Sequence, residues 1–185
     1  MNPTDPAALP TPPAASLRRL AAAEAEAALP GLSRLLADCV VAGASVNFVL
    51  PFGPAEAEAF WRARMLGPLG GGRRIVLLAE AGGEVLGTVQ LDLDTPPNQP
   101  HRAEVTKLLV RPEARRRGVA RALMRAVEAE ARAARRTLLT LDTRAGDPAE
   151  ALYRGLGYVA AGTIPGYALD PQGRQAEAAT ILYKH

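Results

Sequence analysis

The spacing of apolar residues divides most of the chain into helices and strands. Between residues 24 and 42, and again between 118 and 135, apolar residues recur every three or four positions, which is the period of an amphipathic helix. Shorter apolar runs bounded by glycine or proline have the length and composition of strands. We therefore predict helices at 24–42, 54–69, 118–135 and 148–156, and strands at 17–20, 75–80, 85–93, 103–110, 137–142, 158–163 and 178–184.

Individual residues refine these elements. Pro30 lies inside the first predicted helix and predicts a kink or break near its start. Gly82-Gly83 predicts a hairpin turn, and Pro165-Gly166-Tyr167 with Pro171 predicts a loop between the last two strands. Alternation along strand 85–93 predicts that one face carries Val85, Val89, Leu91 and Leu93.

The order β-α-α-β-β-β-α-β-α-β-β predicts a mixed α/β sheet with helices packed on it. Helix 118–135 joins strand 103–110 to strand 137–142, and a right-handed crossover would place these two strands side by side. The 185 residues suit a single domain, which we expect to span residues 16–185. Residues 1–15, rich in proline, alanine and threonine, are expected to form a disordered leader.

Composition argues against several classes of protein. A single cysteine, Cys39, cannot form an internal disulfide, and its apolar helical surroundings predict a core position. Two histidines, His101 and His185, do not assemble a convincing metal site, so we expect no metal. The chain has no apolar run of membrane-spanning length and does not open with a basic segment followed by an apolar one. The expected location is therefore the cytoplasm.

The formal net charge of +3 is mild, but positive charge is concentrated between Arg111 and Arg121. There an apolar strand ends, a turn follows, and a helix opens at basic and small residues. The start of a helix has unpaired N–H groups and favours an anion, Gly118 permits close approach of a ligand, and Arg115 can donate to phosphate oxygens. This segment therefore predicts a pyrophosphate site.

Other interpretations of the basic segment are weaker. The glycine pattern of dinucleotide-binding folds and the Gly-Lys-Ser/Thr of nucleotide triphosphatases are both absent from the sequence. A solvated basic helix start is the ordinary alternative. A nucleic-acid-binding module is the non-enzymatic one, although it lacks aromatic interleaving and a recognition-helix pattern.

Arg115-x-x-Gly118-x-Ala120 resembles the acetyl-CoA signature of the GNAT N-acetyltransferase superfamily, and Tyr153-x-x-x-Gly157-Tyr158 looks like its second motif. The chain from Leu17 onward is similar to the tabtoxin-resistance acetyltransferases within that superfamily. The resemblance implies a mostly antiparallel central sheet with one parallel, splayed strand pair and about four flanking helices. It is carried by residues 43–46, 101–108, 141–146, 149–153, 165–167 and 171–174.

By this resemblance, acetyl-CoA is the co-substrate. Val110 would bond the pantetheine arm, and the N–H of Leu108 would polarise the acetyl carbonyl. Gly146 departs from the wider superfamily, in which many members place a cofactor-binding Asn there. The implied cofactor-binding set is Leu108, Leu109, Val110, Arg115, Arg116, Arg117, Gly118, Val119 and Ala120.

Acetyl transfer to an amine also needs proton transfers. The resemblance implies Glu104 and Asp142 in base or substrate roles and Tyr153 as the acid toward the leaving thiolate. Each has an ordinary alternative: a charge at a strand start for Glu104, a turn former for Asp142, and a half-buried core aromatic for Tyr153. Residues expected to contact the acceptor, or else only to pack, are Asn47, Phe48, Trp61 and Tyr167.

The leading interpretation is an N-acetyltransferase for the primary amine of a small molecule. Two acidic residues at the acceptor side would favour a cationic amine, and the resemblance suggests an amino-acid-like toxin or antibiotic. Acetylation of a protein N-terminus or lysine is the enzymatic alternative, favoured by an open groove rather than a closed pocket. Exposed edge strands at the C-terminus often pair in this superfamily, so the resemblance also suggests a homodimer. Neither a nucleic acid nor a membrane is expected as a partner.

Overall fold

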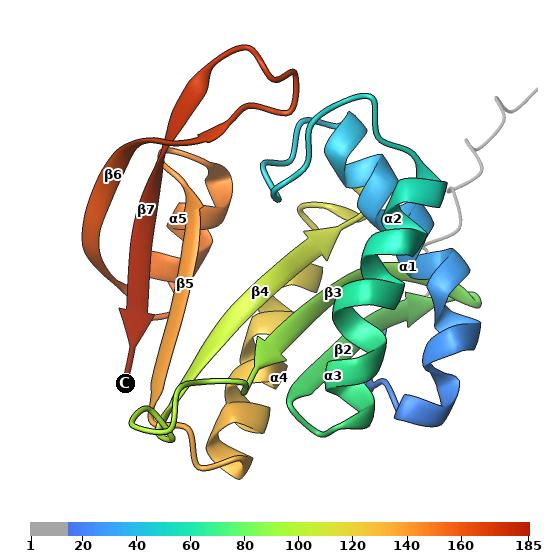
Figure 1. Cartoon of the computed structure of the whole chain (residues 1–185), viewed down its shortest axis with the longest axis horizontal. Helices are drawn as coiled ribbons and strands as arrows, with labels where there is room; N and C mark the ends of the chain where they lie inside the picture. The colour runs from blue at the N-terminus through green and yellow to red at the C-terminus, as the bar shows by residue number, and fades with distance from the viewer. Residues whose placement is uncertain (1–14) are drawn as a thin grey trace, which may run out of the picture.

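The structure, a computed structural model, describes residues 15–185 (Figure 1). Within them the strands are β1 (Ser16–Arg19), β2 (Arg74–Ala81), β3 (Glu84–Asp92), β4 (Arg102–Val110), β5 (Leu138–Arg144), β6 (Val159–Leu169) and β7 (Ala176–Lys184). They form a single sheet in the order β1-β2-β3-β4-β5-β7-β6. In this sheet β4 and β5 are parallel and the other neighbours are antiparallel, which confirms the predicted mixed sheet.

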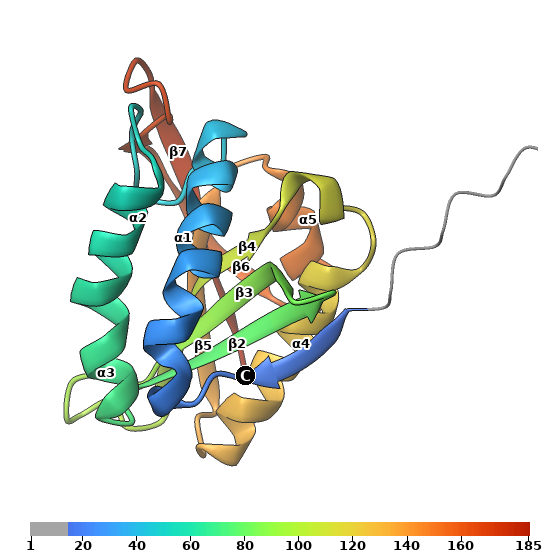
Figure 2. The ribbon, with the colours of Figure 1, turned by 90° about the vertical axis from the view of Figure 1, so that its right-hand side faces the viewer.

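Helices cover both faces of this sheet (Figure 2). They are α1 (Ala25–Val41), α2 (Pro54–Trp61), α3 (Gly67–Gly70), α4 (Val119–Ala133) and α5 (Pro148–Arg154). The first three pack on one face, over an apolar cluster rich in leucine, and α4 and α5 pack on the other. Of the predicted leader, residues 1–14 lie outside the part of the chain that the structure describes.

The helix α4 shows how the sequence pattern fixes the packing. Val119, Leu123 and Val127 recur on one side and are buried against the sheet, while Arg121 and Arg125 on the other side are exposed. Each buried leucine or valine stabilises this arrangement by roughly 1.5–3 kcal/mol relative to an exposed one. The strand that precedes α4 and the strand that follows it are thereby held parallel.

Two predictions about the first two helices need correction. Helix α1 is not broken at Pro30, which lies within it. Pro30 and the residue four positions before it, Glu26, are both exposed, so water can replace the missing hydrogen bond. The predicted helix 54–69 is interrupted by a π-helical turn at Arg62–Leu66 between α2 and α3.

The prediction for the faces of β3 was wrong at Val85. The register of β2 against β3 pairs Ala79 with Gly87 but Glu80 with Val85, so β3 carries one extra residue between them. Such a bulge reverses the alternation of side chains. Val85 therefore packs in the cluster under α1, whereas Val89 packs in the cluster under α4.

The predicted loop at 165–167 is also corrected. These residues lie within β6, and only 170–175 connect β6 to β7. The strand β6 is at the edge of the sheet, with β7 as its neighbour. An edge strand tolerates proline because one side of its backbone faces no ladder partner. The pairing of β6 with β7 is irregular between Ile164 and Ala168, around Pro165.

Candidate active site

The strands β4 and β5 separate partway along their length. They are paired only where Arg102–Glu104 face Leu138–Thr140. Beyond these residues β4 stays bonded to β3 and β5 to β7, and the two strands diverge (Figure 1). Backbone groups on the facing edges of this gap are left without a strand partner, and such groups need another hydrogen-bonding partner when they are enclosed.

Alternation along β4 determines which residues face the gap. The N–H of Arg111 donates to the carbonyl of Leu86 on the β3 side (2.8 Å). Antiparallel alternation then turns the polar groups of Leu109 toward β3 and those of Val110 and Leu108 toward the gap. Leu109 was predicted to bind the cofactor. Its backbone groups face β3 and its side chain is buried, so Leu109 presents no polar group to the gap.

The loop after β4 brings the start of α4 to the open end of the gap. Arg116 (φ 62°) and Gly118 (φ 82°) adopt left-handed backbone conformations that turn the chain. The first bond of the helix runs from the N–H of Ala122 to the carbonyl of Gly118 (3.0 Å). Within residues 15–185, the N–H groups of residues 116–120 find no acceptor.

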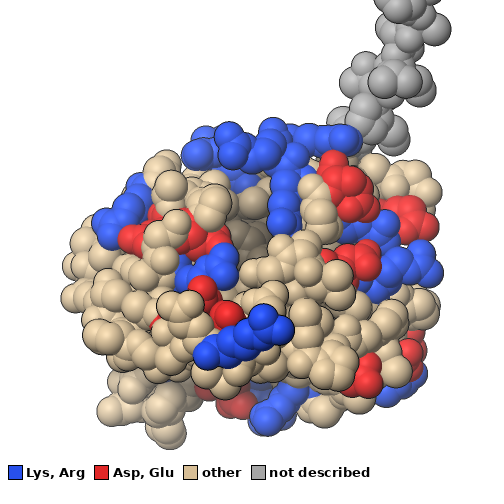
Figure 3. Space-filling view, turned by 90° about the horizontal axis from the view of Figure 1, so that it is seen from above, with Lys and Arg blue, Asp and Glu red and all other residues tan. Residues whose placement is uncertain are grey.

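This loop also concentrates positive charge. Arg115, Arg116 and Arg117 are all exposed. Figure 3 shows this end of the molecule, with basic side chains along one edge of a hollow. Free amides and guanidinium groups at a helix N-terminus form a favourable site for phosphate oxygens. The cofactor residues predicted at 115–120 are thus brought together, next to the gap.

The predicted acids lie on one face of the sheet. Ala103, Leu139 and Leu141 are buried under α4, so alternation turns Glu104 and Asp142 to the opposite face. Glu104 is half-buried, and its pKa is raised by burial first and by the nearby charge of Asp142 second. Asp142 is exposed and lies two residues beyond Thr140, the last residue of β5 that pairs with β4. A carboxylate with a raised pKa is a stronger base.

Tyr153 comes from the other side of the sheet. It lies on α5, is buried, and packs edge-on against Tyr158 with ring centroids 5.9 Å apart. Burial raises its pKa, and the charges of Asp147 and Asp142 raise it further, so the phenol keeps its proton throughout the physiological range. The helix α5 that carries Tyr153 contacts β5.

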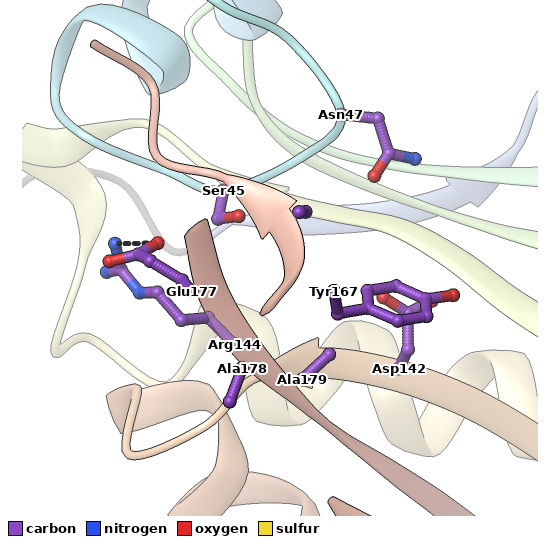
Figure 4. Close-up of a pocket in the computed structure, with 9 residues that line it drawn as sticks. Ser45, Asn47, Asp142, Arg144, Tyr167, Glu177, Ala178 and Ala179 are labelled. Carbon is purple, nitrogen blue, oxygen red and sulfur yellow. Dashed lines mark hydrogen bonds and ion pairs between the residues drawn. The ribbon is translucent and has the colours of Figure 1, made fainter. Parts of the chain in front are cut away.

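A small cavity, open to solvent, lies beside Asp142 (Figure 4). Two of the predicted acceptor residues line it: Asn47, with a left-handed backbone (φ 74°), and Tyr167 of β6. In Figure 4 Arg144 lies apart from these residues, in an ion pair with Glu177. The lining residues are Ser45, Asn47, Asp142, Arg144, Tyr167, Ala168, Glu177, Ala178 and Ala179.

The other two predicted acceptor residues do not line this cavity. Phe48 is half-buried and packs against Phe52 and Phe60, with ring centroids 4.4 and 4.9 Å away. Trp61 is completely buried in the cluster under α1 and α2. The prediction that Trp61 contacts an acceptor is therefore corrected: its ring is a core element.

Two loops meet at the end of the molecule, on the face of the sheet that carries Glu104 and Asp142, which we call the acceptor side. The N–H of Leu50, in the loop between α1 and α2, donates to the carbonyl of Pro171, in the loop between β6 and β7 (2.8 Å). Figures 1 and 2 both show these loops side by side at the top of the molecule. This hydrogen bond thus joins the loop that holds the cavity residues Ser45 and Asn47 to a segment far away in sequence.

One polar residue at this face was missed by the sequence predictions. Lys107 of β4 donates from Nζ to the carbonyl of Val46 (3.3 Å), next to the cavity residues Ser45 and Asn47. Its position between Glu104 and Leu108 was the available signal, but strict alternation would have turned it to the other face.

No helix in residues 15–185 is both long enough and apolar enough to cross a membrane. The same residues contain no group of three or more His, Cys, Asp or Glu side chains placed to hold a metal ion.

Known proteins share both sequence and fold with this chain. The model of the acetyltransferase (GNAT) family matches residues 44–158. An uncharacterized N-acetyltransferase of the hisH-hisA intergenic region of Azospirillum brasilense is 36% identical over 109 residues. That alignment covers 58% of this chain and 62% of the relative, which is less than two thirds of its length.

Solved structures show the same fold at low sequence identity. A ribosomal-protein-alanine N-acetyltransferase from Brucella melitensis has a TM-score of 0.72 and 22% identity, covering 91% of this chain and 98% of its own. A phosphinothricin acetyltransferase from Sinorhizobium meliloti, solved in complex with AcCoA, has a TM-score of 0.73 and 18% identity, covering 92% and 88%. Because the family model covers more than half of the residues, this chain belongs to the acetyltransferase (GNAT) family.

Proposed function

We propose that this protein transfers the acetyl group of acetyl-CoA to the primary amine of a small molecule. The observation that carries the proposal is the gap between β4 and β5. The basic start of α4, with its free amides, lies at its open end, and Glu104 and Asp142 lie on the face beside it. The gap connects a site for a phosphorylated cofactor arm with a site for an amine.

The residues present fit acetyl-CoA. The free amides at 116–120 and the exposed arginines suit its phosphates, and no atom lies within 4 Å of a β-carbon built on Gly118, which leaves room for close approach. The unpaired edge of β4 offers the N–H of Val110 to an amide-containing arm. Val110's carbonyl already accepts from Nε of Arg115 (3.2 Å), which ties this arginine to the gap.

The chemistry requires one bond to form and one to break. The acceptor nitrogen bonds to the acetyl carbon, the carbon–sulfur bond of the thioester breaks, and one proton leaves the nitrogen while one reaches the sulfur. Glu104, whose pKa is raised, takes the proton directly or through a water, and Tyr153 supplies the other. Holding the two reactants together contributes most, up to roughly 7–11 kcal/mol in well-oriented cases.

The bridge between Leu50 and Pro171 favours a small acceptor over a protein. It joins the loop that carries the cavity residues Ser45 and Asn47 to the loop that follows Tyr167 and β6, which restricts the approach to this side of the sheet. An extended peptide would need an open groove there. We extend the proposal to an amino-acid-like toxin or antibiotic on the resemblance to the tabtoxin-resistance acetyltransferases, and we propose detoxification as the role.

The test is release of free thiol when purified protein and acetyl-CoA are mixed with a panel of amines, amino acids, antibiotics and alanine-starting peptides. We expect turnover with a small amine and little with peptides. In parallel, calorimetry measures the binding of CoA with and without added DNA. We expect CoA to bind equally well in both cases. The Glu104→Gln variant is the matched control and should bind CoA while losing turnover. Absence of any CoA binding at millimolar concentration would refute the proposal.

A further inference from the structure

Lys107 occupies a bulge in β4. The register of β3 against β4 pairs Thr88 with Leu109 and Gln90 with Thr106, so β4 advances three residues while β3 advances two. Lys107 lies in this step and has a left-handed backbone (φ 51°). That conformation costs a non-glycine residue about 1–2 kcal/mol. Strain of this kind persists where the surrounding structure requires it, and often at functional sites.

The bulge directs the Lys107 side chain to the acceptor face. In a regular strand it would follow Ala103 and Val105, which are buried under α4. Instead its ammonium lies 5.7 Å from the centroid of the Phe48 ring and 5.4 Å from that of Phe60. Both rings lie on the α1–α2 side of the sheet, as Glu104 does.

The charge of Lys107 is not matched by an ion pair. Within residues 15–185, no carboxylate oxygen lies within 4.0 Å of Nζ. By contrast, Arg144 at the cavity is paired with Asp147 (2.9 Å) and Glu177 (3.4 Å), and Arg74 is paired with Asp92. An ammonium has three N–H donors, and the carbonyl of Val46 uses one.

The surroundings make this cation costly in the absence of an anion. Burial lowers the pKa of Lys107, Arg74 lowers it further, and Asp142 and Glu104 act in the opposite direction from a distance. The aromatic rings attract the ammonium but supply no acceptor oxygen. A partly desolvated ammonium with two free donors is a favourable partner for a carboxylate.

We propose that Lys107 binds an anionic group of the acceptor, so that the preferred acceptor is a short zwitterion. Its ammonium faces Glu104 and Asp142, and its carboxylate lies against Lys107 beside Phe48 and Phe60. This inference rests on the proposed acetyl transfer to an amino-acid-like acceptor and adds to it the residue that selects an acceptor with a carboxylate. Arg144 is excluded from this role because two carboxylates already hold it.

Matched acceptors test the inference. An amino acid that the panel identifies is compared with its methyl ester and with the amine lacking the carboxylate, on the wild type and on Lys107→Met. We expect the wild type to prefer the amino acid in kcat/KM by about tenfold or more, the usual size of a hydrogen bond to a charged group. In Lys107→Met this ratio should fall toward one, mainly through KM. Lys107→Arg should recover part of it.

Lys184→Met is the control, because it removes the other lysine of the described residues, which pairs with Glu128 of α4 (2.7 Å) on the opposite face of the sheet from Phe48 and Phe60. It should keep the wild-type ratio. A wild type without preference for the carboxylate, or equal losses for acid and ester in Lys107→Met, would overturn the inference while leaving acetyl transfer intact. If no amine is acetylated, the proposed function fails. Calorimetry of the panel amino acids and their esters, on wild type and Lys107→Met, then decides the inference: acids bound no better than esters by wild type would overturn it.

Discussion

Asp92 on β3 and Glu104 on β4 lie directly opposite each other in the antiparallel register. Like charges in this arrangement destabilise a sheet unless a cation compensates them. Arg74 on β2, opposite Asp92 on its other side, supplies that cation through an ion pair. The same guanidinium also donates to the carbonyl of Arg64 in the π-helical turn (2.6 Å), which fixes its position.

Because Arg74, Asp92 and Glu104 lie side by side on three neighbouring strands, we expect Arg74 and Asp92 to shift the pKa of Glu104 in opposite directions. The Asp92 charge raises that pKa and the Arg74 charge lowers it. Because a carboxyl group accepts a proton only when it is deprotonated, the proposed role of Glu104 as base predicts that activity rises with pH through its pKa. Arg74→Gln should move this acid limb to higher pH and Asp92→Asn should move it to lower pH. The measurement is the pH profile of kcat/KM.

Controls separate this effect from damage to the fold. Glu104→Gln should remove the limb, and the double variant Arg74→Gln/Asp92→Asn should return it close to its original position. The other charges facing Glu104, those of Arg102, Lys107 and Asp142, are unchanged in these variants. Shifts in the same direction for both single variants, with thermal unfolding showing folded protein, would contradict the prediction.

Tyr153→Phe should slow turnover far more than it weakens CoA binding. The ring stays buried against Tyr158, so packing is kept, while the proton donor is lost. General acid catalysis is typically worth two to four orders of magnitude, so kcat should fall by about 10²-fold or more. Steady-state kinetics and calorimetry with CoA measure the two effects. Equal losses in kcat and in affinity would argue that Tyr153 only shapes the cofactor site.

Gly118→Ala should weaken CoA binding by about tenfold or more, because a β-carbon would block close approach of phosphate to the free amides. It should also lower stability by about 1–2 kcal/mol, since Gly118 has a φ of 82°. Gly72→Ala is the matched control, with a φ of 69° and equally open surroundings far along the chain. It should lose similar stability in thermal unfolding and keep wild-type CoA affinity. If both variants bind CoA like the wild type, the phosphate site lies elsewhere.

Trp61→Phe should leave the KM for the acceptor unchanged. Trp61 is completely buried, and its indole N–H has no partner among the described residues. Removing that unpaired donor offsets part of the cost of the smaller ring, so we expect a loss of less than about 2 kcal/mol in denaturant unfolding. A several-fold rise in KM without loss of stability would return Trp61 to the acceptor site.

Much of the fold was predictable from local sequence. The helical period of residues 118–135 and the glycine turn at 82–83 led to α4 and to the β2–β3 hairpin. The basic segment gave the loop before α4 and its exposed arginines. These features depend on residues within one or two turns of each other, so a single sequence carries them.

Errors arose where distant segments determine the outcome. The bulge that turns Val85 toward α1 depends on how β2 pairs with β3, and the one at Lys107 depends on how β3 pairs with β4. A one-residue shift reverses every face that follows it, and no local periodicity reports it. The strand through Pro165 likewise forms because β7 lies beside it and nothing lies on its other side.

The sequence by itself determined most of the elements and the basic segment before α4, and its resemblance to a family identified Glu104, Asp142 and Tyr153 as candidates. Only the tertiary structure decided that β4 and β5 separate after Glu104, that Trp61 is core, and that Lys107 joins the acceptor face. The physical reason is the range of the interactions. Periodicity and helix starts reflect neighbours along the chain, whereas strand register, burial and the meeting of charges depend on residues brought together by folding.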